Sequence, residues 1–277
     1  MAFLQLNHVV WTFALMSLCA GISACSGRGA TGANGAAIDP EKQSEAEYDV
    51  ARDYFFKGKP RLALDHCRKA VELDDQNVKA LYFASTIHLF FCSGKLDLRD
   101  PDCRLADAES YARRALTVDP TFREAKNTLG QTLILEKRYP EAIAVLAPLT
   151  KDPAFESSYL AWGNLGWAQV LAGQIDQGIE SLKNSITEPR FCVGHYRLGV
   201  ALERKGDLVA AEQSLSNALA VDAPECQALQ DAWQARAEVR TRLGKLPEAH
   251  ADLERCRDIS VETLTGKTCV EALARTQ

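Results

Sequence analysis

Cysteine is the first residue type to consider for chemistry, because its thiol can form disulfides, bind metals and accept covalent modification. The chain has nine cysteines but no Cys-x-x-Cys pair. Beyond the first 24 residues, histidines are scattered rather than set at zinc-ligand spacing: His66, His88, His195 and His250. We therefore expect no metal site, and the use of the cysteines depends on the compartment in which the chain folds.

Carboxylate pairs are the second candidate for chemistry, since two neighbouring carboxyl groups can act as acid and base. Asp74–Asp75 and Glu45 with Glu47 are such pairs, but in helical repeats they are typical of a solvated face. The chain has no Gly-rich phosphate loop, His-Glu-x-x-His or Gly-x-Ser-x-Gly motif in a suitable context. We predict no enzymatic activity, no cofactor and no small-molecule substrate. A net charge of −5 and a pI near 5.6 argue against a nucleic-acid partner.

The first 25 residues have the features of an export signal. Val9 to Leu18 form an apolar stretch of signal-peptide length, too short to span a bilayer. Ile22-Ser23-Ala24-Cys25 resembles the bacterial lipobox, and that resemblance implies that Cys25 becomes the acylated first residue of the mature protein. Cys19 fits less well because Leu18 precedes it. An ordinary secretory signal, cut at a small-x-small site, is the alternative, and the first eight residues depart from the pattern by lacking Lys and Arg.

The segment after Cys25 is too poor in large apolar side chains to form a core. We predict a signal peptide over 1–24 and a flexible tether over 25–43. With no polybasic run, membrane attachment would rest on the acyl chains. By resemblance to sorted lipoproteins, Ser26 in place of an aspartate favours the outer membrane, and we expect a lipid-anchored monomer on its periplasmic face.

The rest of the chain is organised by an internal repeat. A Leu-Gly pair recurs at Leu129-Gly130, Leu165-Gly166 and Leu198-Gly199, each followed twelve residues later by a small residue. This pattern resembles the tetratricopeptide repeat (TPR), a pair of helices, A and B, in a unit of about 34 residues. The small helix-B residues give six repeats: Ala63, Ala108, Ala142, Gly178, Ala211 and Ala249.

The resemblance implies an all-α, right-handed TPR superhelix over 44–260, closed by a capping helix and tail over 261–277. The first two anchors are 45 residues apart, so the A–B turn of the second repeat carries an insertion between Cys92 and Cys103. A loop with a cysteine near each end predicts a disulfide across it. Cys256 with Cys269 would fix the cap, and Cys192 with Cys226 remain by elimination. Cys67 would be a buried free thiol, although six cysteines allow 15 pairings.

TPR proteins bind partners along the surface that their A helices line. The family's positions there give an apolar, aromatic groove rather than the Lys, Asn and Arg of a carboxylate clamp: Tyr48, Arg52, Tyr82, Thr86, Asn127, Gln131, Trp167, Val170, Tyr196 and Val200. Such a groove suits an extended or amphipathic segment of another protein. The alternative is that these aromatic side chains, with Phe55, Leu89 and Ile134, pack inside their own repeats, which leaves the insertion loop as a second candidate binding surface.

A signal peptide, a lipobox, a short tether and six TPRs together resemble the pilotins of type IV pilus systems, the PilF/PilW group and its gliding-motility relative Tgl. The resemblance implies an outer-membrane lipoprotein that binds the secretin subunit and promotes its localisation and multimerisation, supporting pilus assembly and motility. The extra cysteines and the insertion favour a Tgl-like member. An NlpI-like adaptor that scaffolds cell-wall enzymes, or an accessory of outer-membrane protein assembly, is the alternative.

Overall fold

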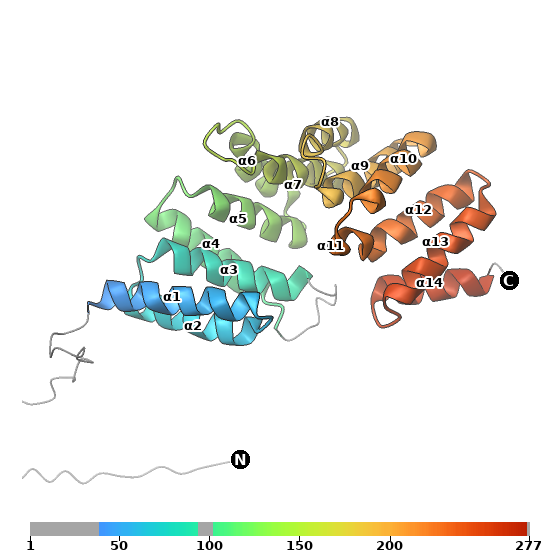
Figure 1. Ribbon diagram of the computed structural model, residues 1–277. Helices are drawn as coiled ribbons and strands as arrows, with labels where there is room; N and C mark the ends of the chain where they lie inside the picture. Colours follow the sequence, from blue (N-terminus) through green and yellow to red (C-terminus); the bar gives the residue numbers. More distant parts are fainter. Residues whose placement is uncertain (1–38, 94–101, 276–277) are drawn as a thin grey trace, which may run out of the picture. The chain divides into compact units, whose positions relative to one another are not determined.

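The computed structural model describes residues 39–93 and 102–275 as a succession of helices joined by turns. In chain order they are α1 (Pro40–Phe56), α2 (Pro60–Leu73), α3 (Val78–Ser93), α4 (Leu105–Val118), α5 (Arg123–Leu135), α6 (Tyr139–Leu149), α7 (Ser158–Leu171), α8 (Ile175–Ser185), α9 (Cys192–Lys205), α10 (Leu208–Ala220), α11 (Pro224–Gln227), α12 (Gln230–Arg242), α13 (Leu246–Ile259) and α14 (Leu264–Arg275). Figure 1 shows them as successive pairs of neighbouring helices.

Six of these pairs are the predicted repeats: α1–α2, α3–α4, α5–α6, α7–α8, α9–α10 and α12–α13. Within each pair, helix A packs along helix B. Each helix A also touches helix A of the next repeat, and each helix B packs against helix A of the next repeat as well. Helix α14 packs on α13 and α12, in the position that a seventh helix A would take. The A helices are therefore in contact in series.

The small residues of the repeat allow helices A and B to approach closely. A side chain on Gly166 of α7 would have its Cβ 2.7 Å from Cγ of Leu182 and 2.9 Å from the backbone oxygen of Gly178 on α8. A Cβ on Gly178 would lie 2.5 Å from Cγ2 of Val170. These separations are too short for real contacts, so the backbones of α7 and α8 can meet here only because both residues are glycine.

The A–B turns share one backbone feature. A residue with positive φ follows helix A in five repeats: Gly58 (71°), Lys137 (62°), Gly173 (83°), Gly206 (92°) and Gly244 (76°). The left-handed conformation suits glycine because it has no Cβ. Lys137 is the departure, and the third repeat therefore holds a lysine where four others have glycine.

The element boundaries differ from the predicted ones at both ends. Helix α1 begins at Pro40 rather than at residue 44, because the Asp39 carboxylate caps it by accepting a hydrogen bond from the Glu41 backbone N–H (3.1 Å) and proline suits the first helical position. The short helix α11 precedes the sixth repeat and was not expected. The cap helix α14 starts at Leu264.

The structure contains the three disulfides that the sequence analysis favours. They join Cys92 to Cys103 across the second A–B turn, Cys192 at the start of α9 to Cys226 on α11, and Cys256 on α13 to Cys269 on α14. Cys67 is free and buried in the core of the first repeats. Residues 94–101 between the first pair lie outside the described residues, as do Cys25, the predicted leader and residues 25–38 of the predicted tether.

Candidate functional site

Four consecutive A helices together form a pocket, here called the central pocket, with a volume of about 240 Å³. Helix α3 contributes one lining residue, α5 three, α7 two and α9 one: Leu89, Gln131, Ile134, Leu135, Asn164, Trp167 and Arg197. Gln131, Ile134 and Leu135 are spaced three and four residues apart, which places them on one face of α5. The pocket therefore lies on the side of the repeats where the sequence predicts the binding groove.

Three polar side chains form a hydrogen-bonded chain across α5, α7 and α9. Asn164 Nδ2 donates to Asn127 Oδ1 (2.9 Å), and Arg197 Nη1 donates to Asn164 Oδ1 (2.8 Å). The same Arg197 nitrogen also donates to the Gly163 backbone oxygen at 3.1 Å. Because Asn127 and Asn164 are buried, their amide positions are set by packing, and the guanidinium is held at the edge of the pocket.

The indole ring of Trp167 lies near two arginines of α9. The guanidinium carbon of Arg197 is 5.9 Å from the ring centroid, and that of Arg204, two turns further along α9, is 5.7 Å away. Both distances allow cation–π attraction. Burial lowers the pKa of Arg197 to about 10, which still leaves it charged at neutral pH. The pocket thus combines a flat aromatic surface, apolar walls and one positive charge.

The aromatic residues predicted toward the N-terminal end of the groove are half-buried between repeats. The Tyr48 ring meets Phe83 edge-on with centroids 5.9 Å apart, and Tyr82 meets Phe122 at 5.3 Å. Burial raises the pKa of both phenols. Thr86 is tied to its own helix, since Oγ1 donates to the Tyr82 backbone oxygen. These residues present part of their surface to the A-helix side and part to the core.

Arg52 lies beside these aromatic residues on α1. Its guanidinium is exposed and sits 5.7 Å from the centroid of the Tyr48 ring. Its Nη1 also lies 3.9 Å from Asp49 Oδ1, three residues earlier on the same helix, and its place in the groove stays a prediction.

Val170 does not line the groove. Its side chain is 1 % exposed and packs where α7 crosses α8 at Gly178. The prediction was wrong because helix B covers this part of α7: the absence of a side chain at Gly178 lets α8 come close enough to bury Val170. Tyr196 and Val200 are partly buried between the fifth and sixth repeats, and burial raises the pKa of Tyr196 to about 12.

The sequence analysis missed Asn164 and Arg197, although a signal for both was present. Each stands directly before a Leu-Gly pair, Asn164 before Leu165-Gly166 and Arg197 before Leu198-Gly199. Since Leu and Gly of the pair face helix B, the residue before them is turned by about 100° toward the neighbouring helix A. A polar residue there in successive repeats indicates a chain of side-chain hydrogen bonds between A helices.

A second missed feature is an aromatic patch at the ends of α1 and α3, here called the terminal patch: Phe55, Phe56, Phe90 and Phe91. The Phe55 ring touches those of Phe56 and Phe90, with centroids 6.3 and 5.3 Å away. Phe56 is 77 % exposed and Phe90 45 % exposed, so the patch offers apolar surface beside the Cys92–Cys103 disulfide. Two Phe-Phe pairs in the sequence were the signal for it.

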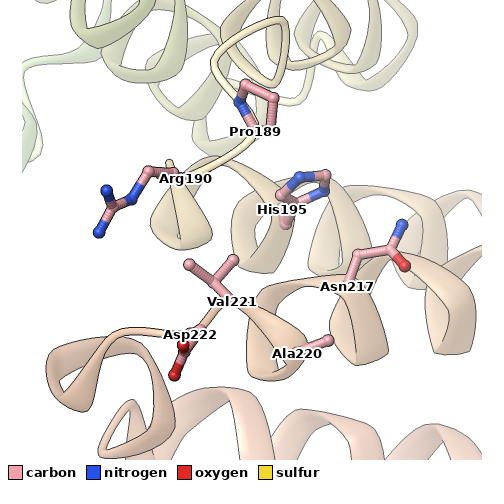
Figure 2. Close-up of a pocket in the computed structure, with 7 residues that line it drawn as sticks. All are labelled: Pro189, Arg190, His195, Asn217, Ala220, Val221 and Asp222. Carbon is pink, nitrogen blue, oxygen red and sulfur yellow. The ribbon is translucent and has the colours of Figure 1, made fainter.

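Another pocket lies in the fifth repeat, between the segment before α9 and the end of α10. Figure 2 shows its lining residues, in which Arg190 and Asp222 extend toward one side and His195 and Asn217 toward the other: Pro189, Arg190, His195, Asn217, Ala220, Val221 and Asp222. Nδ1 of His195 is buried and has no hydrogen-bond partner among the residues that the structure describes, and burial lowers the pKa of this imidazole. At neutral pH the ring is therefore uncharged, and the ionised side chains of this lining are Arg190 and Asp222.

No described helix combines the length and the apolar character needed to cross a bilayer. Over residues 39–93 and 102–275, no group of three or more His, Cys, Asp or Glu side chains is placed to hold a metal ion.

No protein-family model matches the sequence, and no curated protein matches it. Solved structures of other proteins do match this chain. PilW, a widely conserved type IV pilus biogenesis factor, is 19 % identical with a TM-score of 0.66, over 82 % of this chain and 98 % of PilW. PilF of Pseudomonas aeruginosa is 17 % identical with a TM-score of 0.62, over 84 % of this chain and 99 % of PilF.

A match of similar quality comes from the Cut9–Hcn1 assembly of the APC/C. It is 18 % identical with a TM-score of 0.68, over 86 % of this chain and 43 % of that chain. At these identities the likeness shows the fold alone, and it confirms the predicted all-α TPR superhelix.

Proposed function

We propose that this chain is a lipid-anchored outer-membrane protein of type IV pilus assembly. In this role it binds the secretin subunit, promotes secretin localisation and multimerisation, and thereby supports pilus assembly and pilus-dependent motility. The observation that carries the proposal is the match to PilW and PilF over 98 % and 99 % of their lengths. A match of that extent covers nearly the whole of each of those two chains.

The order of parts supports the same proposal. A leader, a lipobox cysteine at Cys25 and a short tether precede the repeats, an arrangement that places a binding surface close to a membrane. The three disulfides suit an oxidising compartment outside the cytoplasm. The same disulfides, with the insertion after Cys92, favour a Tgl-like pilotin over the cysteine-poor members of the group.

The groove supports a protein partner. The surface lined by the A helices extends over several repeats and carries half-buried Tyr48, Tyr82 and Trp167, the kind of aromatic anchors that dominate protein interfaces. The central pocket, at about 240 Å³, suits one or two inserted side chains of a longer segment. Binding, rather than catalysis, is the activity that this surface supports.

The test is a deletion strain examined for secretin multimers by immunoblot and for pili by electron microscopy. We expect monomeric secretin and no pili in the deletion, and recovery of both on complementation with the wild-type gene. Normal secretin multimers and normal pili, together with an altered peptidoglycan profile, would contradict the proposal and favour a cell-wall adaptor. Co-purification of secretin with the wild-type protein would identify the partner directly.

A further inference from the structure

Arg197 places a positive charge in the central pocket without a carboxylate to balance it. Its hydrogen bonds go to an amide oxygen and a backbone oxygen, and no described Asp or Glu forms an ion pair with it. Arg204, the second arginine near the Trp167 ring, likewise has no ion pair among the residues that the structure describes. A partly buried cation with no counter-charge is unfavourable, because burial removes water that would otherwise solvate it.

Other partly buried arginines of the chain are treated differently. Arg236 binds Asp252 through Nε (2.9 Å) and Nη2 (2.7 Å), and Arg240 Nη1 binds the same carboxylate at 2.8 Å. Arg138 forms ion pairs with three glutamates, among them Glu109 on the preceding repeat. The unbalanced charge of Arg197 is therefore specific to this pocket, since partly buried arginines elsewhere in the repeats form ion pairs with carboxylates.

The guanidinium is also held in a fixed position. Nη1 is committed to Asn164 Oδ1 and to the Gly163 backbone oxygen, and Asn164 is itself anchored by Asn127. Nε and Nη2 make no hydrogen bond to the described residues. They remain as donors with the geometry that matches two oxygens of one carboxylate.

The walls around this cation are apolar. Leu89 on α3 and Ile134 and Leu135 on α5 line one part of the pocket, and the Trp167 indole lines another. Low local polarity strengthens an ion pair formed there. The pocket therefore best suits an anionic side chain whose neighbours in the bound segment are apolar.

We propose that the central pocket binds the side-chain carboxylate of an aspartate or glutamate within an apolar segment of the partner protein, with Arg197 as its counter-charge. The inference deepens the proposed function and rests on it for the identity of the partner. Trp167 and the apolar walls bind the residues beside the acid, and Asn164 holds the guanidinium in place.

An internal acidic residue fits better than the carboxylate of a chain terminus. Thr86, one turn before Leu89 on α3, and Val200, one turn after Arg197 on α9, are partly exposed and extend the A-helix surface away from the pocket. A bound segment can therefore continue past the pocket along α3 and along α9. Nothing in the lining forces the bound chain to end beside the guanidinium.

The test uses two phage-displayed libraries of short random peptides and the mature chain as bait. In one library the peptides are fused through their C-termini and have no free carboxylate, and in the other the C-terminus is free. The baits are the wild type, Arg197→Gln and Arg204→Gln. Arg204→Gln is the matched control, since it removes an equal charge from the same helix and the same indole but not from the pocket lining.

We expect the wild type and Arg204→Gln to select apolar peptides with an internal Asp or Glu from the fused library, and Arg197→Gln to lose that acidic preference. In a synthetic peptide, changing the acid to its amide should weaken binding to the wild type by about tenfold or more, and leave binding to Arg197→Gln unchanged. Each of these results supports an ion pair with Arg197.

The proposal is overturned if Arg197→Gln keeps the acidic preference, if the preference occurs only with a free C-terminus, or if no acid is selected. Should Arg197→Gln fail to fold, equal affinity of the acid and amide peptides for the wild type still overturns it. Neither library contains the secretin, so failure here leaves the proposed function standing. Intact secretin multimers in a deletion strain would, in turn, leave the peptide result standing.

Discussion

At the scale of single residues, the groove depends on a few side chains whose neighbours fix their positions. Asn127 and Asn164 are buried and hydrogen-bonded to each other, so they cannot turn away from Arg197 without leaving polar atoms unsatisfied. Trp167 is held by cation–π contact with two arginines of α9. Side chains ordered before binding lose little conformational entropy when a partner arrives.

Trp167→Ala should weaken binding of the secretin by at least about tenfold, because a truncated aromatic anchor typically costs 2 kcal/mol or more. Trp167→Phe is the matched control and should keep most of the affinity, since it retains a ring against the arginines. Binding is measured by calorimetry after circular dichroism has shown intact helicity and cooperative melting. Unchanged affinity in a folded Trp167→Ala variant would direct attention to the terminal patch instead.

Cys67 should be chemically inert in the folded protein. Burial raises the pKa of its thiol to about 12, so very little of it is the reactive thiolate near pH 8. We expect iodoacetamide to alkylate Cys67 only after denaturation, while the other described cysteines remain in their disulfides. Peptide mapping by mass spectrometry under non-reducing conditions checks both statements. A fast-reacting Cys67 in the native state would show that the first repeat opens readily.

At the scale of the elements, the repeats are alike in their cores and differ in their turns and links. Four A–B turns use glycine in the left-handed conformation, whereas the third repeat uses Lys137. Two disulfides reinforce the C-terminal half, where Cys226 ties α11 to α9 and Cys269 ties the cap helix to the sixth repeat. A terminal repeat has only one neighbour, so a covalent link at that end offsets the missing interface.

Lys137→Gly should stabilise the protein by about 0.5 to 1 kcal/mol, because a non-glycine residue in the left-handed region costs about 1 kcal/mol or more, and the greater entropy of glycine in the unfolded chain offsets part of that gain. Lys137→Ala is the control and should give no gain, since alanine keeps the Cβ that causes the strain. Urea unfolding followed by circular dichroism measures the difference. Equal stability of both variants would mean that the turn relaxes around the lysine.

At the scale of the whole molecule, the proposed function joins a predicted export leader and lipobox to a stack of TPR helices. In the proposed function, the acyl chains expected at Cys25 supply the membrane affinity. The predicted tether over 25–43 would then keep the repeats close to the membrane surface. In the proposed function, this confines the search for the secretin to the layer in which it must assemble.

Cys25→Ala should abolish lipidation and release the protein to the periplasm, or leave it uncleaved in the inner membrane. Cys19→Ala is the matched control and should fractionate with the outer membrane like the wild type. The measurement is membrane fractionation with metabolic labelling by a radioactive fatty acid. Normal outer-membrane fractionation of Cys25→Ala would show that another feature anchors the chain.

Much of this architecture could be derived from the sequence, because its determinants are local. The small residue of each helix B and the Leu-Gly pair of helix A recur at a nearly fixed spacing, and close helix packing at those points requires small side chains. The same periodicity places most of the cysteines relative to the repeats, which favoured the Cys92–Cys103 and Cys256–Cys269 pairs and a buried Cys67, whereas the Cys192–Cys226 pair followed only by elimination. Capping by Asp39 and the short helix α11 were missed, since a single turn carries too little pattern to be recognised.

The tertiary structure decided which residues line the groove and how far each is exposed. Periodicity locates the A-helix face of each repeat, but the exposed fraction of a side chain depends on how far helix B and the next helix A cover it, as the burial of Val170 shows. Arg197 illustrates the same limit. Whether its charge is balanced depends on every side chain around it in space, and its contacts Asn164 and Trp167 are some thirty residues away in the chain. Contacts between repeats created the central pocket, and no single repeat encodes it.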